Sequence, residues 1–497
     1  MTVLVDYISE HLSRELAGTH SLSIQVVRSQ PRRSYALFPH ASNHKTCKIW
    51  QEEVLCVLND ASGASVVPVP VCAIEASVYT VPSTATSILY ISKVDTTGLE
   101  RPRPRRRRRA GPSPTKAFVS SFIAYHLEHP PHATTRVRVH VFARSQSQYL
   151  FPGSADNRDS KRVLDDKALI RWWKSTLSTA ITTTSSPTST VDAFYLVPGL
   201  TYLESLPYVP LDPAAAAAPP RWTYGHPYST LSSPLHPLGS PPSTHPLPDH
   251  IPAFPDDPKS RFLHSLTSSS VAPSGSDGDY DDVRHDLVNL AFASGNPSTP
   301  HQRQQVVDRD RDRETNRLVH GVEGGVEEWW ERMQFRQECC SGVLVGFFVV
   351  AIGERPPAAE PIKKDKDEVV DRKPTTTLAP SPYPASLPHA TFTKLWTEFH
   401  NQDYGRANVD HLVAQLDKWS KDVRRLVHLE VEKGSVRAGE VEVKFTVENP
   451  DDDDARDGGD DDEETKKRRA AGETVPSDVA EVKKINTLAP RKKKKVV

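Results

Sequence analysis

Five stretches of this chain are too rich in proline and charge to bury a hydrophobic core, and they limit what the chain can fold into. Proline accounts for 43 of the 497 residues, about 9% where about 5% is usual, so much of the chain is expected to be linker and loop. The stretches lie at residues 101–114, 210–252, 267–314, 354–388 and 450–497. The length alone would allow about three domains of roughly 150 residues. We instead predict one large domain over residues 1–449, interrupted by four disordered insertions and followed by a disordered acidic and basic tail at 450–497.

The net charge of the chain hides blocks of opposite sign. Lys and Arg number 62 against 63 Asp and Glu, a formal charge of -1, and such an average excludes little by itself. An acidic run from Asp451 to Glu464 gives way to a final basic cluster from Arg491 to Lys495. This order is typical of a solvated, disordered tail, and also of a nuclear localisation signal or a tail that docks on a chaperone. We predict a location in the nucleus.

The cysteines and the apolar runs exclude several classes of protein. The five cysteines form no Cys-x-x-Cys pair and have no histidine at zinc-ligand spacing, so we predict neither a disulfide scaffold nor a metal site. The longest apolar run, Cys339 to Gly353, is shorter than the ~18 to 20 residues of a membrane span, so no membrane partner is predicted. Charged residues interrupt the apolar pattern of Met1 to Gly18. We expect a docked amphipathic helix there, in a protein of the reducing cytosol or nucleus, and not a signal peptide.

Between the five stretches, apolar residues recur at either strand or helix spacing. Strand patterns are found at 88–93, 136–143, 194–197 and 342–352, and a closing hairpin is predicted at 429–447. Helical spacing predicts helices over 118–127, 165–177, 261–266 and 395–427. The mixture predicts an α/β core that is interrupted by long insertions.

The segment Phe254-Pro-Asp-Asp-Pro-Lys-Ser-Arg261 has two compatible interpretations. In the structural one, Asp257 is the N-cap of a helix that begins at Pro258 and buries apolar residues on one face. In the functional one, Asp256 and Asp257 are two carboxylates in a proline-stiffened turn, where one acts as a base or holds a substrate cation. A free aspartate has a pKa of about 3.9, so it is a poor base unless its surroundings raise that value. Both interpretations stand, because an N-cap aspartate can still line a cleft.

The adjacent tryptophans Trp172 and Trp173 lie near the end of a predicted helix. Neighbouring helical residues point about 100° apart, so one ring can fill the core while the other faces outward. An outward indole would form a wall for a planar ligand or an alkyl-ammonium chain. The alternative is that both rings are packing residues.

A run of five arginines, Arg105 to Arg109, allows several interpretations. Such a run is most often a solvated loop, a nuclear localisation signal or a patch that binds nucleic acid. Its position soon after the turn at Lys93 to Gly98 adds another, because backbone N–H groups and arginines at a strand-to-helix turn suit a polyphosphate ligand. The sequence pattern alone leaves these alternatives open.

Three separated segments together resemble one family. They are Ile88 to Gly98, Phe142 to Pro152 leading to Trp172-Trp173, and Phe254 to Phe262. In this order they resemble the fungal histone acetyltransferase family that modifies histone H3 with the help of histone chaperones, and the terminal Ile485-Asn-Thr-Leu488 is similar too. The resemblance implies an α/β fold with a central mixed sheet surrounded by helices in a single catalytic domain, related to the metazoan CREB-binding-protein acetyltransferases. It also implies acetyl-CoA as the cofactor.

The resemblance further implies roles for individual residues. Asp257 would be the catalytic acid or base with Asp256 beside it, Asp95 would attract the incoming ammonium, and Trp173 would flank the alkyl stem of the substrate lysine. Lys259 matches a buried lysine that becomes autoacetylated. The residues expected to bind acetyl-CoA are Val94, Asp95, Thr96, Arg105, Arg106, Arg107, Arg108, Arg109, Phe142, Ala143, Arg144, Gln148, Tyr149, Lys161, Arg162, Val163, Leu164 and Trp172.

These residue types suit acetyl transfer to a lysine. A thioester is already activated, so the enzyme must mainly deliver a neutral amine, and a free lysine with a pKa of about 10.4 must first lose a proton. We predict a histone lysine acetyltransferase that acts on H3 in H3–H4 presented by a histone chaperone, in chromatin assembly and genome stability. No sequence-specific contact with nucleic acid is predicted. The alternatives are a non-enzymatic nuclear protein that binds histones or nucleic acid, and an acyltransferase that acts on small molecules.

Overall fold

A computed structural model describes the backbone over thirteen segments of the chain. These are residues 4–34, 37–38, 48–62, 67–99, 112–184, 190–209, 220–227, 236–238, 251–268, 325–335, 343–353, 385–434 and 439–449. The chain divides into two units, Met1–Pro450 and Asp451–Val497, and every described residue lies in the first. The predictions made for Arg105 to Arg109, for residues 267–314 beyond Ser268, and for the tail therefore fall outside the described residues.

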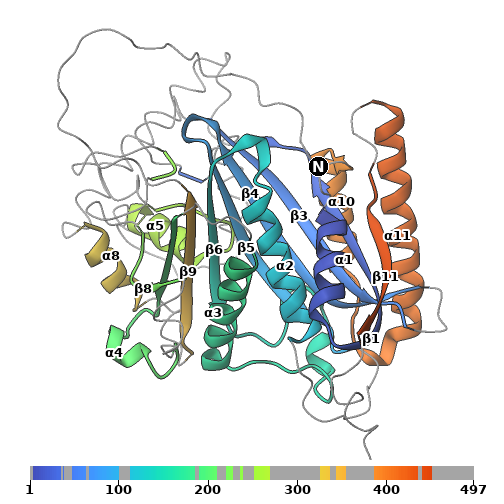
Figure 1. Cartoon of the computed structure of the whole chain (residues 1–497), viewed down its shortest axis with the longest axis horizontal. Helices are drawn as coiled ribbons and strands as arrows, with labels where there is room; N and C mark the ends of the chain where they lie inside the picture. Colours follow the sequence, from blue (N-terminus) through green and yellow to red (C-terminus); the bar gives the residue numbers. More distant parts are fainter. Residues whose placement is uncertain are drawn as a thin grey trace, which may run out of the picture. The chain divides into compact units, whose positions relative to one another are not determined.

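One mixed sheet of eleven strands forms the centre of the described part (Figure 1). The order is β10-β1-β3-β4-β5-β6-β9-β7-β8, with β11 paired to β1 and β2 to β3. Neighbours are antiparallel except for β5 with β6, β7 with β8 and β1 with β10, which are parallel. The strands are β1 (Gly18–Ser29), β2 (Arg32–Ser34), β3 (Ile49–Asp60), β4 (Val69–Val81), β5 (Thr86–Thr96), β6 (Arg136–Arg144), β7 (Thr190–Leu196), β8 (Trp222–Tyr224), β9 (Val345–Gly353), β10 (Ser386–Leu387) and β11 (Glu442–Asn449).

Helices cover both faces of this sheet, which confirms the predicted fold class. On one face α1 (Leu4–Glu15), α2 (Pro114–Glu128) and α3 (Asp166–Thr183) lie side by side, and α10 (His389–His400) and α11 (Val409–Glu432) pack on the other (Figure 1). The shorter helices are α4 (Tyr202–Ser205), α5 (Pro258–Ser268) and α8 (Gly325–Met333). Single 3-10 turns lie at Pro82–Thr84, Pro131–Ala133, Ser154–Asp156 and Arg406–Asn408. No helix in the described segments is long and apolar enough to cross a bilayer.

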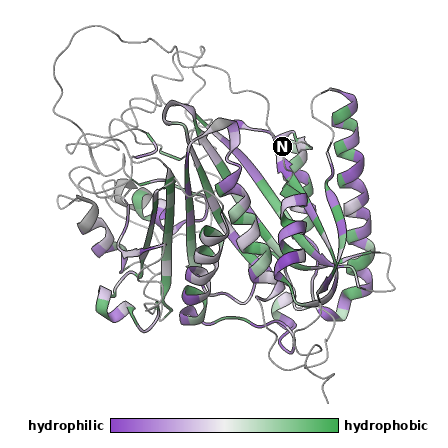
Figure 2. Cartoon of the chain, in the orientation of Figure 1, coloured by the Kyte–Doolittle hydropathy of each residue, from purple (hydrophilic) through white to green (hydrophobic). Residues whose placement is uncertain are grey.

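The core follows from the alternation of side chains along the central strands. In β3, Val54 and Cys56 join the cluster under α1, α2 and α3, whereas Leu55 and Val57 join the cluster under α10 and α11. Successive strand residues point to opposite faces, and a strand covered on both sides therefore reads as a nearly continuous apolar run. Figure 2 shows the same arrangement, with largely hydrophobic central strands and hydrophilic residues along the outer side of α11.

Local signals explain where the long helices begin. Ser113 caps α2 by accepting a hydrogen bond from Lys116 N at 3.3 Å, and Pro114 follows at the first helical position. Asp165 caps α3 in the same way by accepting from Ala168 N at 2.7 Å. Most predicted helices and strands are present with bounds that differ by a few residues.

Two predictions near the C-terminal end of the domain are wrong. The single helix expected over residues 395–427 is two helices, because the chain turns at Tyr404 to bury its ring against Phe151 and Phe399. The hairpin expected at 429–447 does not form. Its first residues end α11, and β11 pairs with β1 from the far end of the chain. Strands β8 and β10 also lie inside stretches that were expected to be disordered. Each is short and is held by backbone hydrogen bonds to a neighbouring strand, β7 for β8 and β1 for β10.

Candidate active site

The parallel strands β5 and β6 end side by side and form the first part of the site. Their register runs from Thr86 opposite Arg136 to Ile91 opposite Val141. Ligands of α/β proteins bind beyond the carboxyl ends of parallel strands, where the connecting loops diverge. Six of the residues predicted to bind the cofactor lie at these two ends: Val94, Asp95, Thr96, Phe142, Ala143 and Arg144.

Asp95 at the end of β5 fixes the loop that follows β6. It is 6% exposed, and its Oδ2 accepts hydrogen bonds from Tyr149 N at 2.6 Å and Leu150 N at 3.0 Å. Its Oδ1 accepts from Thr96 N and from the ammonium of Lys161, both at 2.8 Å. A buried charge is stable only when it is paired in this way. These contacts argue against the predicted roles of Asp95 as an attractor of substrate ammonium and of Lys161 as a cofactor ligand, since each already serves the other.

Asn157 joins three segments next to this pair. Its Nδ2 donates to the carbonyls of Thr97 at 2.7 Å and Tyr404 at 2.9 Å, and its Oδ1 accepts from Arg406 N at 2.8 Å. The guanidinium of Arg406 donates to Gly98 O at 3.1 Å. The sequence analysis missed Asn157 and Arg406, because their partners lie up to 308 residues away and leave no local pattern.

Gly98 is required where the chain leaves β5. Its φ is +68°, and a Cβ there would lie 2.6 Å from the Cβ of Lys161. Only glycine accepts both the left-handed backbone and this close approach. Leu99 is the last described residue before the arginine-rich run, which lies outside the described segments.

The side chains around this edge fit a cofactor that carries phosphate groups. Arg144 is partly exposed, and Gln148, Arg162 and Arg406 are exposed, while the charge of Asp95 is neutralised by Lys161. Arginine pairs well with phosphate through two parallel hydrogen bonds. Tyr149 is partly buried, and burial raises the pKa of its phenol, so it stays neutral. Val163 is 48% exposed and Leu164 is partly exposed beside Arg162, and this edge therefore offers both polar and apolar contacts.

The tryptophan pair on α3 is divided between the core and the surface, as one interpretation expected. Trp173 is 5% exposed and belongs to the core cluster under the helices, with Ile170 and Leu177. Trp172 is partly exposed, and the two rings meet edge to face at 5.0 Å. The burial of Trp173 is at odds with its predicted role beside a substrate lysine, because its ring is used in packing.

Asp257 and Lys259 form a buried pair at the start of α5. Asp257 is fully buried and Lys259 is 4% exposed. Oδ1 of Asp257 accepts from Lys259 N at 2.9 Å, and Oδ2 pairs with the ammonium of the same lysine. The predicted N-cap is therefore confirmed. The same carboxylate caps the helix and compensates a buried cation.

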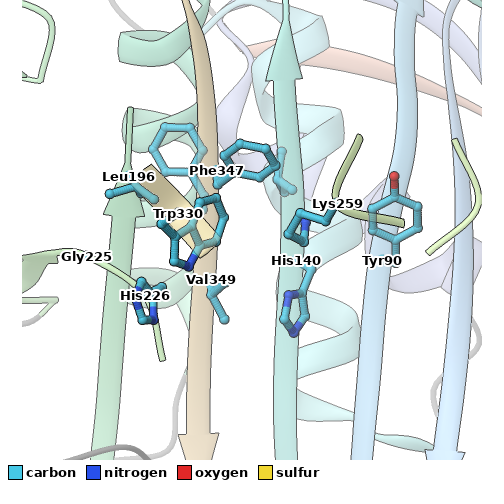
Figure 3. A pocket seen from close by; sticks show the side chains of 11 residues that line it. Tyr90, His140, Leu196, Gly225, His226, Lys259, Trp330, Phe347 and Val349 are labelled. Atoms are coloured by element: carbon cyan, nitrogen blue, oxygen red, sulfur yellow. The ribbon is translucent and has the colours of Figure 1, made fainter. Parts of the chain in front are cut away.

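Aromatic side chains lie around Lys259 of this pair (Figure 3). Tyr90 of β5 stacks on Phe254 with ring centroids 4.3 Å apart and donates to Pro255 O at 3.1 Å. The ammonium of Lys259 lies 4.6 Å from the centroid of Phe347, and His140 of β6 lies beside it. A cavity of about 10 Å³ remains between them, which is about the space of one water molecule.

Burial keeps the neighbouring titratable groups neutral. Burial and the charges of Lys259 and Arg138 hold the pKa of His140 well below its usual range. Burial and the charge of Asp257 raise the pKa of Tyr90 well above its usual range. Lys259 is thus a cation in a pocket that is lined mainly by aromatic and apolar side chains.

Asp256 lies next to this pair but on the surface of the turn. It is exposed and its φ is +57°, and its carboxylate lies 3.8 Å from the ammonium of Lys93. The structure therefore brings Asp256, Asp257 and Lys259 together beside Tyr90. Among the described residues, no hydrogen bond or ring contact joins them to Trp172 or Trp173.

The fold and this site define an α/β protein with a phosphate-compatible strand edge and a buried acid–lysine pair. Residues 104–420, well over half of the chain, match the histone acetyltransferase KAT11-type domain. The chain therefore belongs to the KAT11-type histone acetyltransferase family, and the resemblance stated above is confirmed.

Individual relatives agree with this assignment. The chain is 28% identical over 413 residues to the histone acetyltransferase rtt109 of Aspergillus flavus, covering 74% of this chain and 64% of that protein. It is 27% identical over 228 residues to rtt109 of Schizosaccharomyces pombe, covering 44% and 41%. The match thus spans less than two thirds of either relative. The crystal structure of Rtt109 from Aspergillus fumigatus superposes with a TM-score of 0.60 at 22% identity, over 90% of this chain and all of that one, which establishes the fold.

Proposed function

We propose that this protein is a lysine acetyltransferase that transfers the acetyl group of acetyl-CoA to histone H3 in the H3–H4 complex. The observation that carries the proposal is the family match over residues 104–420 on a chain that buries an aspartate–lysine pair beside Tyr90 of β5 and His140 of β6. The rtt109 relatives from Aspergillus flavus and Schizosaccharomyces pombe are histone acetyltransferases, and this chain carries a histone acetyltransferase domain of the KAT11 type.

The acyl donor fits the edge formed by the ends of β5 and β6. Acetyl-CoA would supply an activated thioester, so the residues of this chain must bind its phosphates and bring an amine to it. Arg144, Arg162 and the arginines at 105–109 would hold the phosphates. The loop fixed by Asp95, which carries Gln148 and Tyr149, would form the wall of the cleft.

The Asp257–Lys259 pair gives the proposed chemistry its proton acceptor. In the described state Asp257 is occupied by the ammonium of Lys259. Acetylation of Lys259 would remove that charge and leave Oδ2 of Asp257 able to accept a proton from a substrate lysine, directly or through the water-sized cavity nearby. Asp256, on the exposed side of the turn, would attract the incoming ammonium.

The proposal extends to partners and location. Histone H3–H4 would be presented by a histone chaperone, and the acidic run and the basic cluster of residues 451–497 suit contact with basic histones and entry into the nucleus. Work in chromatin assembly, transcription regulation and the response to DNA damage would follow from that substrate.

The test is acetyl transfer by the purified full-length chain. Radiolabelled acetyl-CoA is incubated with H3–H4, with and without a histone chaperone, and label on H3 is measured for the native protein and for Asp257→Asn. We expect label on H3 that rises with chaperone and falls by at least about a hundredfold in Asp257→Asn. Histone binding without label would favour a non-enzymatic binding protein, and label on free polyamines alone would favour a small-molecule acyltransferase.

A further inference from the structure

A β-bulge in β5 decides which side chains face the turn at Asp256. Glu75 of β4 pairs with Lys93, but the next residue, Ala76, pairs with Ile91, so Ser92 is an extra residue in β5. Before the bulge, Tyr90 points towards Phe254 while Leu89 and Ile91 point into the core under α1, α2 and α3. A bulge shifts the alternation by one residue and often re-aims a side chain next to an active site. Lys93 therefore shares the face of Tyr90 and not the face of Ile91.

Glu75 holds Lys93 in this position from the neighbouring strand. Its Oε1 accepts from Lys93 Nζ at 3.2 Å and from Ser92 Oγ at 2.8 Å, so the bulged serine takes part. Its Oε2 accepts from Trp396 Nε1 of α10 at 2.9 Å. Burial alone would raise the pKa of Glu75, but the charge of Lys93 and the hydrogen bonds outweigh burial and lower it. Glu75 is thus an ionised anchor between the sheet and α10.

The ammonium of Lys93 lies between two carboxylates. It is 3.2 Å from Glu75 Oε1 and 3.8 Å from Asp256 Oδ2, with the side chain only 18% exposed. Asp256 has a left-handed backbone, which is uncommon for a residue other than glycine and needs support from its surroundings. Without the cation, Asp256 and Glu75 would be two carboxylates facing one gap.

We propose that Lys93 is a positioning residue for the turn that carries Asp256 and Asp257. Its ammonium, anchored by Glu75, holds the carboxylate of Asp256 and so fixes the turn ahead of α5. This inference rests on the proposed acetyl transfer, because it assigns Lys93 to the acceptor side of that reaction. It predicts that Lys93 affects the catalytic rate more than the binding of acetyl-CoA.

The test compares Lys93→Met, which keeps the length of the side chain but removes the charge, with Lys93→Arg. Lys394→Met is the control, since Lys394 is an exposed lysine of α10 whose ion pair with Glu398 lies within its own helix. Steady-state kinetics are measured against acetyl-CoA and against chaperone-bound H3–H4. Hydrogen exchange of peptides spanning residues 254–261 is measured on the protein without ligands.

We expect Lys93→Met to lower kcat about tenfold while the KM for acetyl-CoA changes by less than about twofold. Exchange at the amides of Asp257 and Ser260 should become faster, and Lys93→Arg should restore most of both properties. Lys394→Met should match the native protein. If Lys93→Met unfolds, Glu75→Gln is the second test of the inference. This variant keeps the lysine but weakens the ion pair that anchors it. We expect it to lower kcat by less than about tenfold.

Three outcomes would overturn the inference. The first is a kcat of Lys93→Met that equals that of the native protein. The second is a loss of stability in Lys93→Met that changes all kinetic constants equally and that Lys93→Arg shares. The third is unchanged exchange at the turn. Absence of acetyl transfer by the native protein would instead remove the proposed function, and the exchange experiment would still show whether Lys93 orders the turn.

Discussion

Asp257 binds Lys259 at both ends of the residue: one carboxylate oxygen accepts its backbone N–H at 2.9 Å, and the other pairs with its ammonium. The two charges are sealed from solvent, at 0% and 4% exposure. Loss of one member of a buried ion pair leaves the other charge buried without a partner, which costs free energy. Loss of both members removes that cost.

We therefore expect Lys259→Met and Asp257→Asn each to lower the free energy of unfolding by about 3 to 5 kcal/mol. The double variant should recover most of that loss, and urea unfolding of all four proteins measures the coupling. Exposed Lys421→Met, which breaks an ion pair on the surface of α11, is the control and should change stability by less than about 1 kcal/mol. Additive single effects would contradict the coupling.

The buried His126 should make stability depend on pH. Burial, together with the charge of Arg28, lowers its pKa to about 3, so the folded protein does not protonate it between pH 6.5 and 3, whereas the unfolded chain does. The stability is thus fully present above about pH 6.5 and falls as the pH drops towards 3, by about 2 kcal/mol at pH 5 from this group alone.

The measurement is urea unfolding at pH 7 and pH 5 for the native protein and for His126→Gln. We expect the difference between the two pH values to be about 2 kcal/mol smaller in the variant. His428→Gln, which alters an exposed histidine of α11, should keep the native difference. An equal difference in all three proteins would mean that His126 is protonated in the folded state.

Asn157 should be needed both for stability and for the proposed cofactor cleft. Asn157→Asp keeps an acceptor for Arg406 N but cannot donate to the carbonyls of Thr97 and Tyr404. Since the site is buried, we expect a loss of about 2 to 4 kcal/mol and weaker binding of acetyl-CoA measured by calorimetry. Unchanged affinity for acetyl-CoA would mean that the hydrogen bonds of Asn157 do not contribute to the cofactor cleft.

The two tryptophans of α3 should behave differently. Trp173→Ala empties a core position and should lower the free energy of unfolding by about 3 to 5 kcal/mol. Trp172 is only partly buried, so Trp172→Ala should cost clearly less, and a loss of acetyl-CoA binding in that variant would assign the outward ring to the cleft. Thermal or urea unfolding measures the stability of both variants, and calorimetry measures their binding of acetyl-CoA. Equal destabilisation by both changes would contradict the division between core and surface.

Sequence patterns predicted the elements whose periodicity is local. The spacing in α1 and α3 reflects one buried face, whereas α2 and β6 have a buried position at nearly every step. Both kinds of pattern are local, so they can be recognised without a structure. The N-cap role of Asp257 could also be predicted, because it depends on residues that follow it directly.

The remaining features depend on contacts between distant segments. Nothing near β11 shows that β1 is its partner, and the bulge at Ser92 depends on how β4 is aligned with β5. Asp95 and Trp173 were recognised as important, but their roles depend on partners such as Lys161 and on the core under the helices. A pattern identifies such residues without showing whether they contact a ligand or the rest of the protein.

The pairing of β11 with β1 has a consequence for how the protein is made. Residues 18–25 emerge early during synthesis, yet their hydrogen-bonding partners, residues 442–449, are among the last of the described domain. Until then one border of the sheet has unsatisfied backbone groups that can pair with other chains. Long sequence separation also slows folding. Nascent or shortened forms that lack β11 would therefore be the ones most in need of protection against aggregation.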